Sequence, residues 1–248
     1  MQLGRLIKGR KATFEEYEDA IFKATICVKG NPKGEEIKED IVMACPKMPQ
    51  KLFGQAVGFL HACYRERKSE GMIYFILRQD PFETDKGTWE LAVPLQYNSM
   101  VRVCAHAERE PALFADAVGD MHSHPAMDWS GHSGTDDHDE KQHNHGVYAV
   151  LSWKGGEIPS VKGDVTIYGY IRGRKIIMHP EHMIDFTTPE PDYQFPREWM
   201  NKVFDGWCKI CHKEDPVKDV SKEKTRRFKF KPLNESGLFN EENRNNWH

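Results

Sequence analysis

An amphipathic segment at residues 51–67, followed almost at once by the apolar run MIYFILR, constrains the fold more than any other part of the sequence. Apolar side chains recur in the first segment at three- and four-residue intervals, the period of a helix with one buried face. The second segment is short and apolar on both sides, which is typical of a strand inside a sheet. A helix packed on a buried strand predicts a layered domain that contains both kinds of element.

Further strands are expected on both sides of this pair. Upstream, AIFKATICV and EDIVMAC flank the turn-prone GNPKG, which predicts a β-hairpin within residues 20–45. Downstream, the strand candidates are WELAVPLQY, MVRVCAH, GVYAVLSW, DVTIYGYI and RKIIMHP. The predicted fold class is therefore α/β, an α+β sandwich with a central mixed β-sheet flanked by helices.

The composition changes after about Pro189. PEPDYQFP is a proline-rich connector, and residues 218–231 contain seven Lys or Arg residues against two acidic ones. We expect an N-terminal hairpin extension at 1–46, a main domain at 47–188 and a basic C-terminal extension at 189–248. The basic run is interpreted as a solvated tail, with docking to an acidic partner as the alternative.

Composition excludes several classes of protein. The chain has 248 residues and 39% hydrophobic content, enough for a substantial core. Lys and Arg total 35 against 38 Asp and Glu, so the net charge of −3 does not favour nucleic acid as a partner. No apolar run approaches the roughly 18 residues of a membrane helix, and the first 22 residues lack the apolar region of a signal peptide. A cytoplasmic location with reduced cysteines is expected.

Histidines are concentrated in one part of the chain. Six of the twelve fall within residues 121–146, together with five acidic residues. In an extended segment His122 and His124 project from the same side, so both imidazoles can reach one metal ion. A catalytic zinc site has a third protein ligand and keeps its fourth position for water. Asp136 can supply that ligand if the loop folds back.

The same loop also has a purely structural interpretation. Ser133, followed three residues later by Asp136, is a capping-box pattern, and the acidic residues that follow would suit the first turns of a helix. The two interpretations are compatible, because such a turn also places a hydroxyl and a carboxylate on one face toward the histidines.

His-Ser-His-Pro, followed by Ser-Gly-Thr-Asp and then a strand such as GVYAVLS, resembles the JAMM (JAB/MPN) zinc metallopeptidases, most of all their bacterial members encoded beside ubiquitin-like proteins. The resemblance spans about residues 45–186. The family pattern is an upstream Glu, His-x-His, a seven-residue gap and Ser-x-x-Asp, whereas this chain has a gap of eight residues. A one-residue insertion would absorb the difference. It leaves Ser130 and Asp137 as alternatives to Ser133 and Asp136, which the intact SGTD string favours.

The resemblance implies an MPN/JAB-like (cytidine-deaminase-like) fold and one catalytic Zn²⁺ held by His122, His124 and Asp136. The family's upstream glutamate lies where a first helix ends and a buried strand begins. Glu70, in KSEGMIYFIL, occupies that junction. The rival is Glu90 in TWELAVP, which is more easily interpreted as the polar face of an alternating strand.

The implied reaction is amide hydrolysis by metal-activated water. Glu70 would act as general base and then as general acid, and Ser133 would stabilise the oxyanion. The bond would follow the C-terminal tail of a ubiquitin-like protein, which makes that protein, its conjugates and the E1-like and E2-like proteins of the same system the expected partners. The alternatives are an inactive MPN-type scaffold and a metal-dependent hydrolase of small molecules.

One further motif lies in the C-terminal extension. Cys208, Cys211 and His212 form Cys-x-x-Cys-His, which occurs at c-type haem attachment sites and can supply half of a structural zinc site. No second cysteine pair is near in the sequence and export is not expected, so these cysteines are interpreted as reduced thiols. The remaining histidines of the rich segment are expected on the surface.

Overall fold

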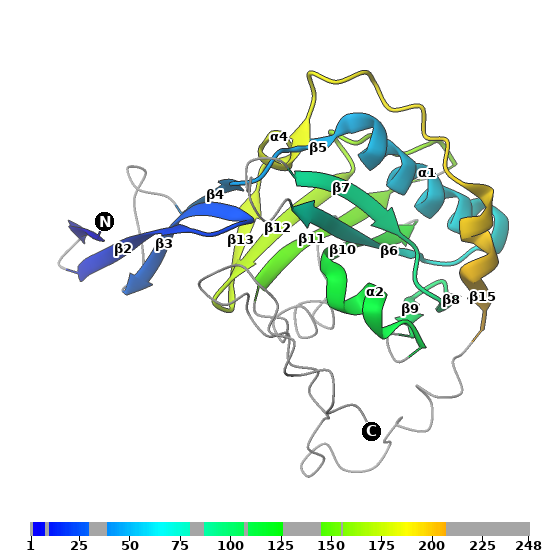
Figure 1. The fold of residues 1–248 in the computed structure, drawn as a ribbon, viewed down its shortest axis with the longest axis horizontal. Helices are drawn as coiled ribbons and strands as arrows, with labels where there is room; N and C mark the ends of the chain where they lie inside the picture. The colour runs from blue at the N-terminus through cyan, green and yellow to red at the C-terminus, as the bar shows by residue number, and fades with distance from the viewer. Residues whose placement is uncertain are drawn as a thin grey trace, which may run out of the picture.

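The structure is a computed structural model that describes residues 2–7, 10–29, 39–79, 87–106, 109–125, 145–154 and 156–206. Its elements alternate strands with a few helices (Figure 1). In chain order they are β1 (Gln2–Ile7), β2 (Arg10–Glu18), β3 (Phe22–Lys29), β4 (Asp40–Met43), β5 (Met48–Pro49), α1 (Gln50–Arg67), β6 (Met72–Gln79), β7 (Gly87–Ala92), β8 (Gln96–Ser99), β9 (Arg102–Ala105), α2 (Pro111–Asp116), β10 (Ala117–Pro125), β11 (His145–Trp153), β12 (Val165–Ile171), β13 (Arg174–Met178), α4 (Pro180–Met183), β14 (Ile184–Asp185), the 3₁₀ helix η2 (Arg197–Lys202) and β15 (Val203–Asp205).

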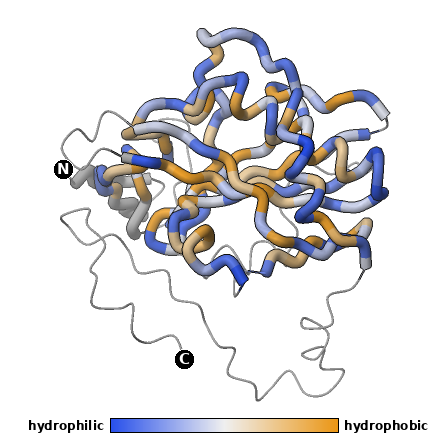
Figure 2. Tube along the Cα trace, turned by 45° about the vertical axis from the view of Figure 1, so that its right-hand side comes forward, coloured by the Kyte–Doolittle hydropathy of each residue, from blue (hydrophilic) through white to orange (hydrophobic). Residues whose placement is uncertain are grey.

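The centre of the molecule is a six-stranded sheet in the order β13-β12-β11-β10-β6-β7. Strands β10 and β11 run parallel, and the other neighbours are antiparallel. Helix α1 packs on this sheet with Phe53, Val57 and Leu60 fully buried. Hydrophobic residues gather along the strands in the middle of the molecule (Figure 2). The expectation of a mixed α and β fold around a central sheet is confirmed.

The helix and strand that constrain the fold lie where the sequence predicts them. Helix α1 ends at Lys68, which adopts the left-handed conformation with φ 53°, and its N–H donates to Tyr64 O at 2.9 Å. This closing turn is a common end for a helix. The chain then enters β6 within four residues, so the junction between α1 and β6 is short.

The segment WELAVPLQY does not form one strand. It divides into β7 and β8, with residues 93–95 between them outside any strand. Pro94 has no N–H to donate to a ladder, which explains the interruption. Strand β8 is not part of the central sheet. It belongs to a three-stranded sheet in the order β15-β8-β9, which we call the small sheet.

The N-terminal region is larger than the expected hairpin. Strands β3 and β4 pair antiparallel as expected, but β1 and β2 precede them and complete a four-stranded antiparallel sheet that projects from the body (Figure 1). Its buried side packs on β12, where a Cβ added to Gly169 would lie 2.1 Å from Ile41 Cδ1. The glycine therefore leaves the space that Ile41 fills.

The residues expected to form a connector after Pro189 pack closely along α1. A Cβ added to Gly54 would lie 2.2 Å from Pro191 Cβ, and one added to Gly58 would lie 1.9 Å from Tyr193 O. We call residues 189–196 the strap. Beyond the strap, η2 and β15 bring the chain back to β8. Among the residues that the structure describes, no helix is long and apolar enough to cross a membrane.

Candidate functional site

Two of the predicted zinc ligands lie side by side at the end of β10. The rings of His122 and His124 have centroids 4.9 Å apart and are tilted by 60° to each other. Their side chains are buried, with exposed fractions of 4% and 5%. The strand places them two residues apart, and side chains alternate across a strand, so both lie on one face of the sheet.

An acidic residue accompanies the first histidine. Asp120, two residues upstream and on the same face, has Oδ1 3.6 Å from His122 Nδ1. A carboxylate beside one nitrogen of an imidazole favours a proton on that nitrogen. Sequence reasoning missed Asp120, although the period of two that paired the histidines would have placed it with them.

Glu70 lies on the neighbouring strand end. His122 is in register with Met72 on β6, Ser123 N donates to Gly71 O at 3.1 Å, and Gly71 N donates to Ser123 Oγ at 3.0 Å. One step further in this antiparallel register, Glu70 is level with His124. Glu70 is buried, with 5% of its surface exposed.

The rival carboxylate lies elsewhere. Glu90 is in register with Ile76, and Ile76 is in register with Ala117, so Glu90 is level with the first residue of β10 rather than with its end. It is exposed, and its Oε2 accepts a hydrogen bond from Arg78 Nε at 3.1 Å. The structure therefore brings Glu70, and not Glu90, to the histidine pair.

The backbone of Glu70 is held by the small sheet. Its N–H donates to Ser99 O at 2.8 Å, and its carbonyl accepts from Asn98 Nδ2 at 2.7 Å. Gln96 binds both backbone groups of Met72, accepting from N at 2.9 Å and donating to O at 2.8 Å. We call the fully buried side chains of Gln96 and Asn98 the β8 clamp. It fixes the backbone on both sides of Gly71.

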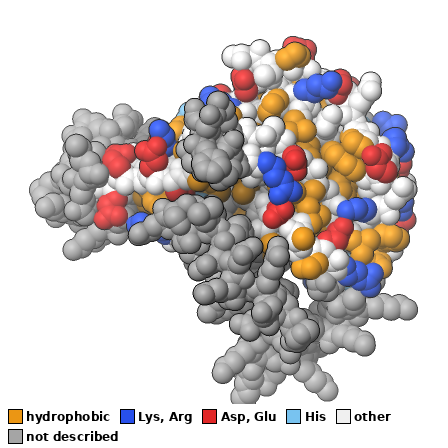
Figure 3. All heavy atoms as spheres, viewed as in Figure 1, with side chains coloured by type: hydrophobic (Ala, Val, Ile, Leu, Met, Phe, Trp, Pro, Cys, Tyr) orange, Lys and Arg blue, Asp and Glu red, His pale blue; other side chains and the backbone are white. Residues whose placement is uncertain are grey.

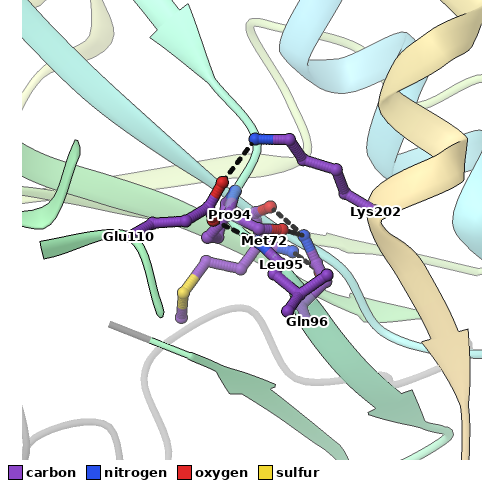
Figure 4. A network of polar contacts seen from close by, with 6 residues as sticks. All are labelled: Met72, Pro94, Leu95, Gln96, Glu110 and Lys202. Atoms are coloured by element: carbon purple, nitrogen blue, oxygen red, sulfur yellow. Dashed lines mark hydrogen bonds and ion pairs between the residues drawn. The ribbon is translucent and has the colours of Figure 1, made fainter. Parts of the chain in front are cut away.

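The β8 clamp is anchored in turn by an ion pair. Glu110 accepts from Leu95 N at 2.5 Å through one carboxylate oxygen and from Lys202 Nζ at 2.7 Å through the other (Figure 4). Gln96 turns toward Met72 and Pro94 in the same view. Lys202 belongs to η2, so the C-terminal part of the described chain supports the strand that holds Glu70.

On its other side, β10 borders a buried serine. Ser152 on β11 is in register with His124, and its Oγ is buried with no hydrogen-bond partner among the described residues. The next residue, Trp153, packs edge-on against Tyr64 and His61 of α1 at 5.7 and 5.9 Å between ring centroids. Burial lowers the pKa of His61 below its ordinary value. A serine at the end of an apolar strand has no local sequence pattern that would predict its position beside His124.

The rest of the predicted site lies outside the described residues. This applies to Ser133 and Asp136 and to their alternatives Ser130 and Asp137, which follow Pro125, the last residue of β10. Within the described parts of the chain, no group of three or more His, Cys, Asp or Glu residues is placed to hold a metal ion. The described residues of the predicted site are thus the two imidazoles of His122 and His124, and Glu70, which is level with His124.

In the comparison with known proteins, neither a family model nor a curated protein matches the chain. The chemical argument therefore depends on the residues themselves. They are two buried imidazoles on one face, a carboxylate beside the first of them and a buried glutamate on the adjoining strand end. These groups can bind a divalent metal ion and exchange a proton with a molecule bound to it.

Proposed function

We propose that the chain is a zinc-dependent peptidase of the JAMM (JAB/MPN) type, built on an MPN-like arrangement of the central sheet. It hydrolyses the peptide or isopeptide bond that follows the C-terminal tail of a ubiquitin-like protein. The observation that carries the proposal is the position of Glu70, buried and level with His124 at the junction of α1 and β6. This is where the family pattern places its catalytic glutamate.

The residues fit a zinc ion. His122 and His124 would hold it from one face of β10, and Asp136 would complete the ligand set. Asp120 Oδ1 lies 3.6 Å from His122 Nδ1, close to where a carboxylate commonly accompanies a ligand histidine. When bound, zinc supplies a Lewis acid and lowers the pKa of a water molecule to about 7.

Glu70 moves the proton. Its carboxylate accepts a proton from the attacking water and then delivers it to the departing amine, so one group serves as base and acid in turn. The β8 clamp holds the carbonyl of Glu70 at 2.7 Å and thereby limits the positions that its side chain can take. The Ser133 hydroxyl donates to the oxyanion that develops on the scissile carbonyl.

An extended peptide suits this site better than a nucleotide. The sequence has no glycine-rich phosphate-binding loop, and a peptide tail can add to a strand edge by main-chain hydrogen bonds. Strand β9 is an edge of the small sheet, whose strand β8 holds Glu70. We propose the glycine-terminated tail of a ubiquitin-like protein or its conjugates as the substrate and the cytoplasm as its location, with E1-like and E2-like proteins of the same system as partners.

The two alternatives make different demands on the site. An inactive scaffold makes no use of a glutamate level with His124, so replacing Glu70 would not change what a scaffold does. A hydrolase of small molecules would use the same metal and glutamate. It would cleave small amides in preference to a ubiquitin-like fusion.

The test replaces the two rival glutamates in the full-length zinc-loaded protein. Glu70→Gln is expected to retain its zinc and its fold but to lose about 10²–10⁴-fold in cleavage of a ubiquitin-like fusion, because an amide cannot accept the proton. Glu90→Gln is the matched control and should cleave normally. His122→Ala should lose both zinc and activity.

Two results would contradict the proposal. One is normal turnover by Glu70→Gln. The other is a zinc-loaded wild type that cleaves no ubiquitin-like fusion, which would favour the scaffold or the small-molecule hydrolase. Cleavage should also fall when the terminal glycines of the fusion are replaced by bulky residues, since a metal held by His122 and His124 and the Ser133 hydroxyl would both have to reach the scissile bond.

A further inference from the structure

The hydroxyl of Ser152 is a buried polar group that the proposed peptidase mechanism does not use. Ser152 has 6% of its surface exposed, and its Oγ is shielded from solvent with no hydrogen-bond partner among the described residues. A hydroxyl buried in this way is uncommon in folded proteins, because it loses its hydrogen bonds to water and gains none in return. A partner that is engaged when the metal is bound would account for the serine.

Ser152 lies in one row with two residues of the candidate site. Strands β10 and β11 lie side by side in the central sheet (Figure 1), and His124 is in register with Ser152. Glu70 is level with His124 on the other side of β10. Residues that are level on neighbouring strands point to the same face of a sheet, so Ser152 lies on the face that carries both histidines.

The first histidine has its polar neighbour in a different place. His122 is in register with Val150, whose side chain has no polar atom. The polar group beside its ring is the carboxylate of Asp120, two residues upstream on the same strand. Each ligand histidine therefore has a polar neighbour on its own face, Asp120 for His122 and Ser152 for His124.

The Ser152 hydroxyl can reach one nitrogen of His124 and not the other. Neighbouring strands lie about 4.8 Å apart, and both the Oγ of a serine and the Nδ1 of a histidine are close to their Cβ atoms. Nε2 lies on the far side of the ring. The Nδ1 atom of His124 is itself shielded from solvent, as the Ser152 hydroxyl is.

On the other side of Ser152 the polar groups have partners of their own. Ser152 N donates to Asp164 O at 2.9 Å, which continues the pairing of β11 with β12. Asp164 Oδ2 accepts a hydrogen bond from Ser160 N at 2.6 Å, within the turn that precedes β12. His124 is therefore the level neighbour to which the hydroxyl can turn.

We propose that Ser152 is a positioning residue that accepts a hydrogen bond from the Nδ1–H of His124 and so presents Nε2 of that ring to the zinc ion. The inference rests on the proposed function, because it concerns a residue that would hold the metal. A histidine that binds a metal almost always donates a hydrogen bond from its second nitrogen, which keeps the proton there and fixes the angle of the ring. Ser152 touches neither the metal nor the substrate in this role.

The test measures the zinc affinity of the full-length protein by competition with a chelator of known affinity. Ser152→Ala is expected to bind zinc about 10–100-fold more weakly than the wild type, which is the usual cost of removing such a partner. The urea midpoint of the metal-free protein should not fall, since the hydroxyl has no partner among the described residues there. Excess zinc should restore cleavage of a ubiquitin-like fusion by Ser152→Ala but not by Glu70→Gln.

Ser69→Ala is the matched control. Ser69 has 1% of its surface exposed, and its Oγ is likewise buried without a hydrogen-bond partner among the described residues. It precedes β6 and is not level with either histidine. The control variant should therefore bind zinc as tightly as the wild type.

Two results would overturn the inference. One is a Ser152→Ala protein with the zinc affinity of the wild type or of a Ser69→Ala protein equally weakened. The other is a Ser152→Ala protein whose metal-free form unfolds at lower urea, because packing would then explain the loss of zinc. The proposed function fails by a different result: if zinc affinity falls in Ser152→Ala as expected but the zinc-loaded wild type cleaves no ubiquitin-like fusion, the role of Ser152 stands and the peptidase does not.

Discussion

A carboxylate far from the candidate site joins the N-terminal sheet to the central sheet. Asp19 accepts hydrogen bonds from Tyr17 OH at 2.6 Å and from the N–H groups of Ile21 and Phe22 at 2.8 and 2.7 Å. Its Oδ2 also lies 3.0 Å from His145 Nε2, at the first residue of β11. Burial alone would raise the pKa of Asp19, but its partners, His145 first among them, lower this pKa to about 2.

The Asp19→Asn substitution is expected to reduce stability at neutral pH by about 2 kcal/mol, since an unfolded aspartate has a pKa of about 3.9. The sign follows from the lowered pKa. The contribution is fully present above about pH 4 and is lost as the pH falls through 2. Urea unfolding at pH 7, 4.5, 3 and 2 should therefore show a gap between wild type and variant that closes in acid.

The exposed pair of Asp192 with Lys51, at 3.6 Å, provides the control for this prediction. Surface ion pairs contribute between 0 and about 1 kcal/mol, so Asp192→Asn should change stability little at any pH. A gap for Asp19→Asn that stays constant between pH 7 and pH 2 would show that the carboxylate is not the source of the stability.

Single residues differ in how well the sequence predicts them. His122, His124 and Glu70 could be chosen because their roles leave local signals, namely a spacing of two and a helix–strand junction. Their chemical roles stay predictions. Ser152 and the β8 clamp left no such signal. A buried polar side chain is explained only by the tertiary neighbour it binds, and that neighbour can lie far away in the sequence.

At the scale of elements, strong periodicity decided what could be predicted. Helix α1 and strand β6 follow from their apolar patterns, and the structure confirms both. Strands β1 and β2 were not predicted, because β2 has five charged residues among nine and β1 is a short segment in which Gly4 and Arg5 interrupt the apolar residues. Strand β15 has three residues and becomes a strand only by pairing with β8, which no local pattern can indicate.

The close contact between α1 and the strap gives a prediction about one glycine. Alanine at an exposed helix position is about 1 kcal/mol better than glycine, so Gly→Ala in a helix normally stabilises. At Gly58 the new Cβ would lie 1.9 Å from Tyr193 O, a backbone atom that cannot move without displacing the strap. Gly58→Ala is therefore expected to lower stability by about 1–3 kcal/mol, measured by urea unfolding.

Gly163→Ala is the matched control for this prediction. Its Cβ would come no closer than 3.8 Å to Ser160 Cβ, so the substitution should be nearly neutral. A Gly58→Ala variant as stable as the wild type would mean that the strap does not lie against α1 as described. Trypsin cleavage after Arg197, directly beyond the strap, should also become faster in Gly58→Ala if the strap is displaced.

At the scale of the whole molecule, the numbers of basic and acidic residues nearly balance. Basic and acidic side chains are interspersed on the face shown in Figure 3, and the net charge is −3. The predicted domain boundary at residue 189 depends on composition alone and takes no account of how the residues after it pack.

The contacts beyond residue 189 yield the last prediction. Met200 and Val203 are buried, Phe59 of α1 packs edge-on against Phe195 and Trp199 at 5.8 Å between ring centroids, and Lys202 binds Glu110. A chain shortened to residues 1–188 loses all of these contacts. Each buried apolar side chain contributes about 1.5–3 kcal/mol, so we expect a loss of more than about 4 kcal/mol in the free energy of unfolding.

The matched chain for this comparison is 1–212, which keeps every described residue and the Cys-x-x-Cys-His motif. Its urea midpoint should lie close to that of the full-length protein, whereas 1–188 should unfold at much lower urea or fail to fold. Equal midpoints for 1–188 and 1–212 would show that the strap, η2 and β15 add nothing to the fold. The expected difference would instead place the end of the main domain near Gly206. Strand β8 binds Glu70 through Asn98, and Gly206 N donates to Asn98 O, so residues up to Gly206 support the site.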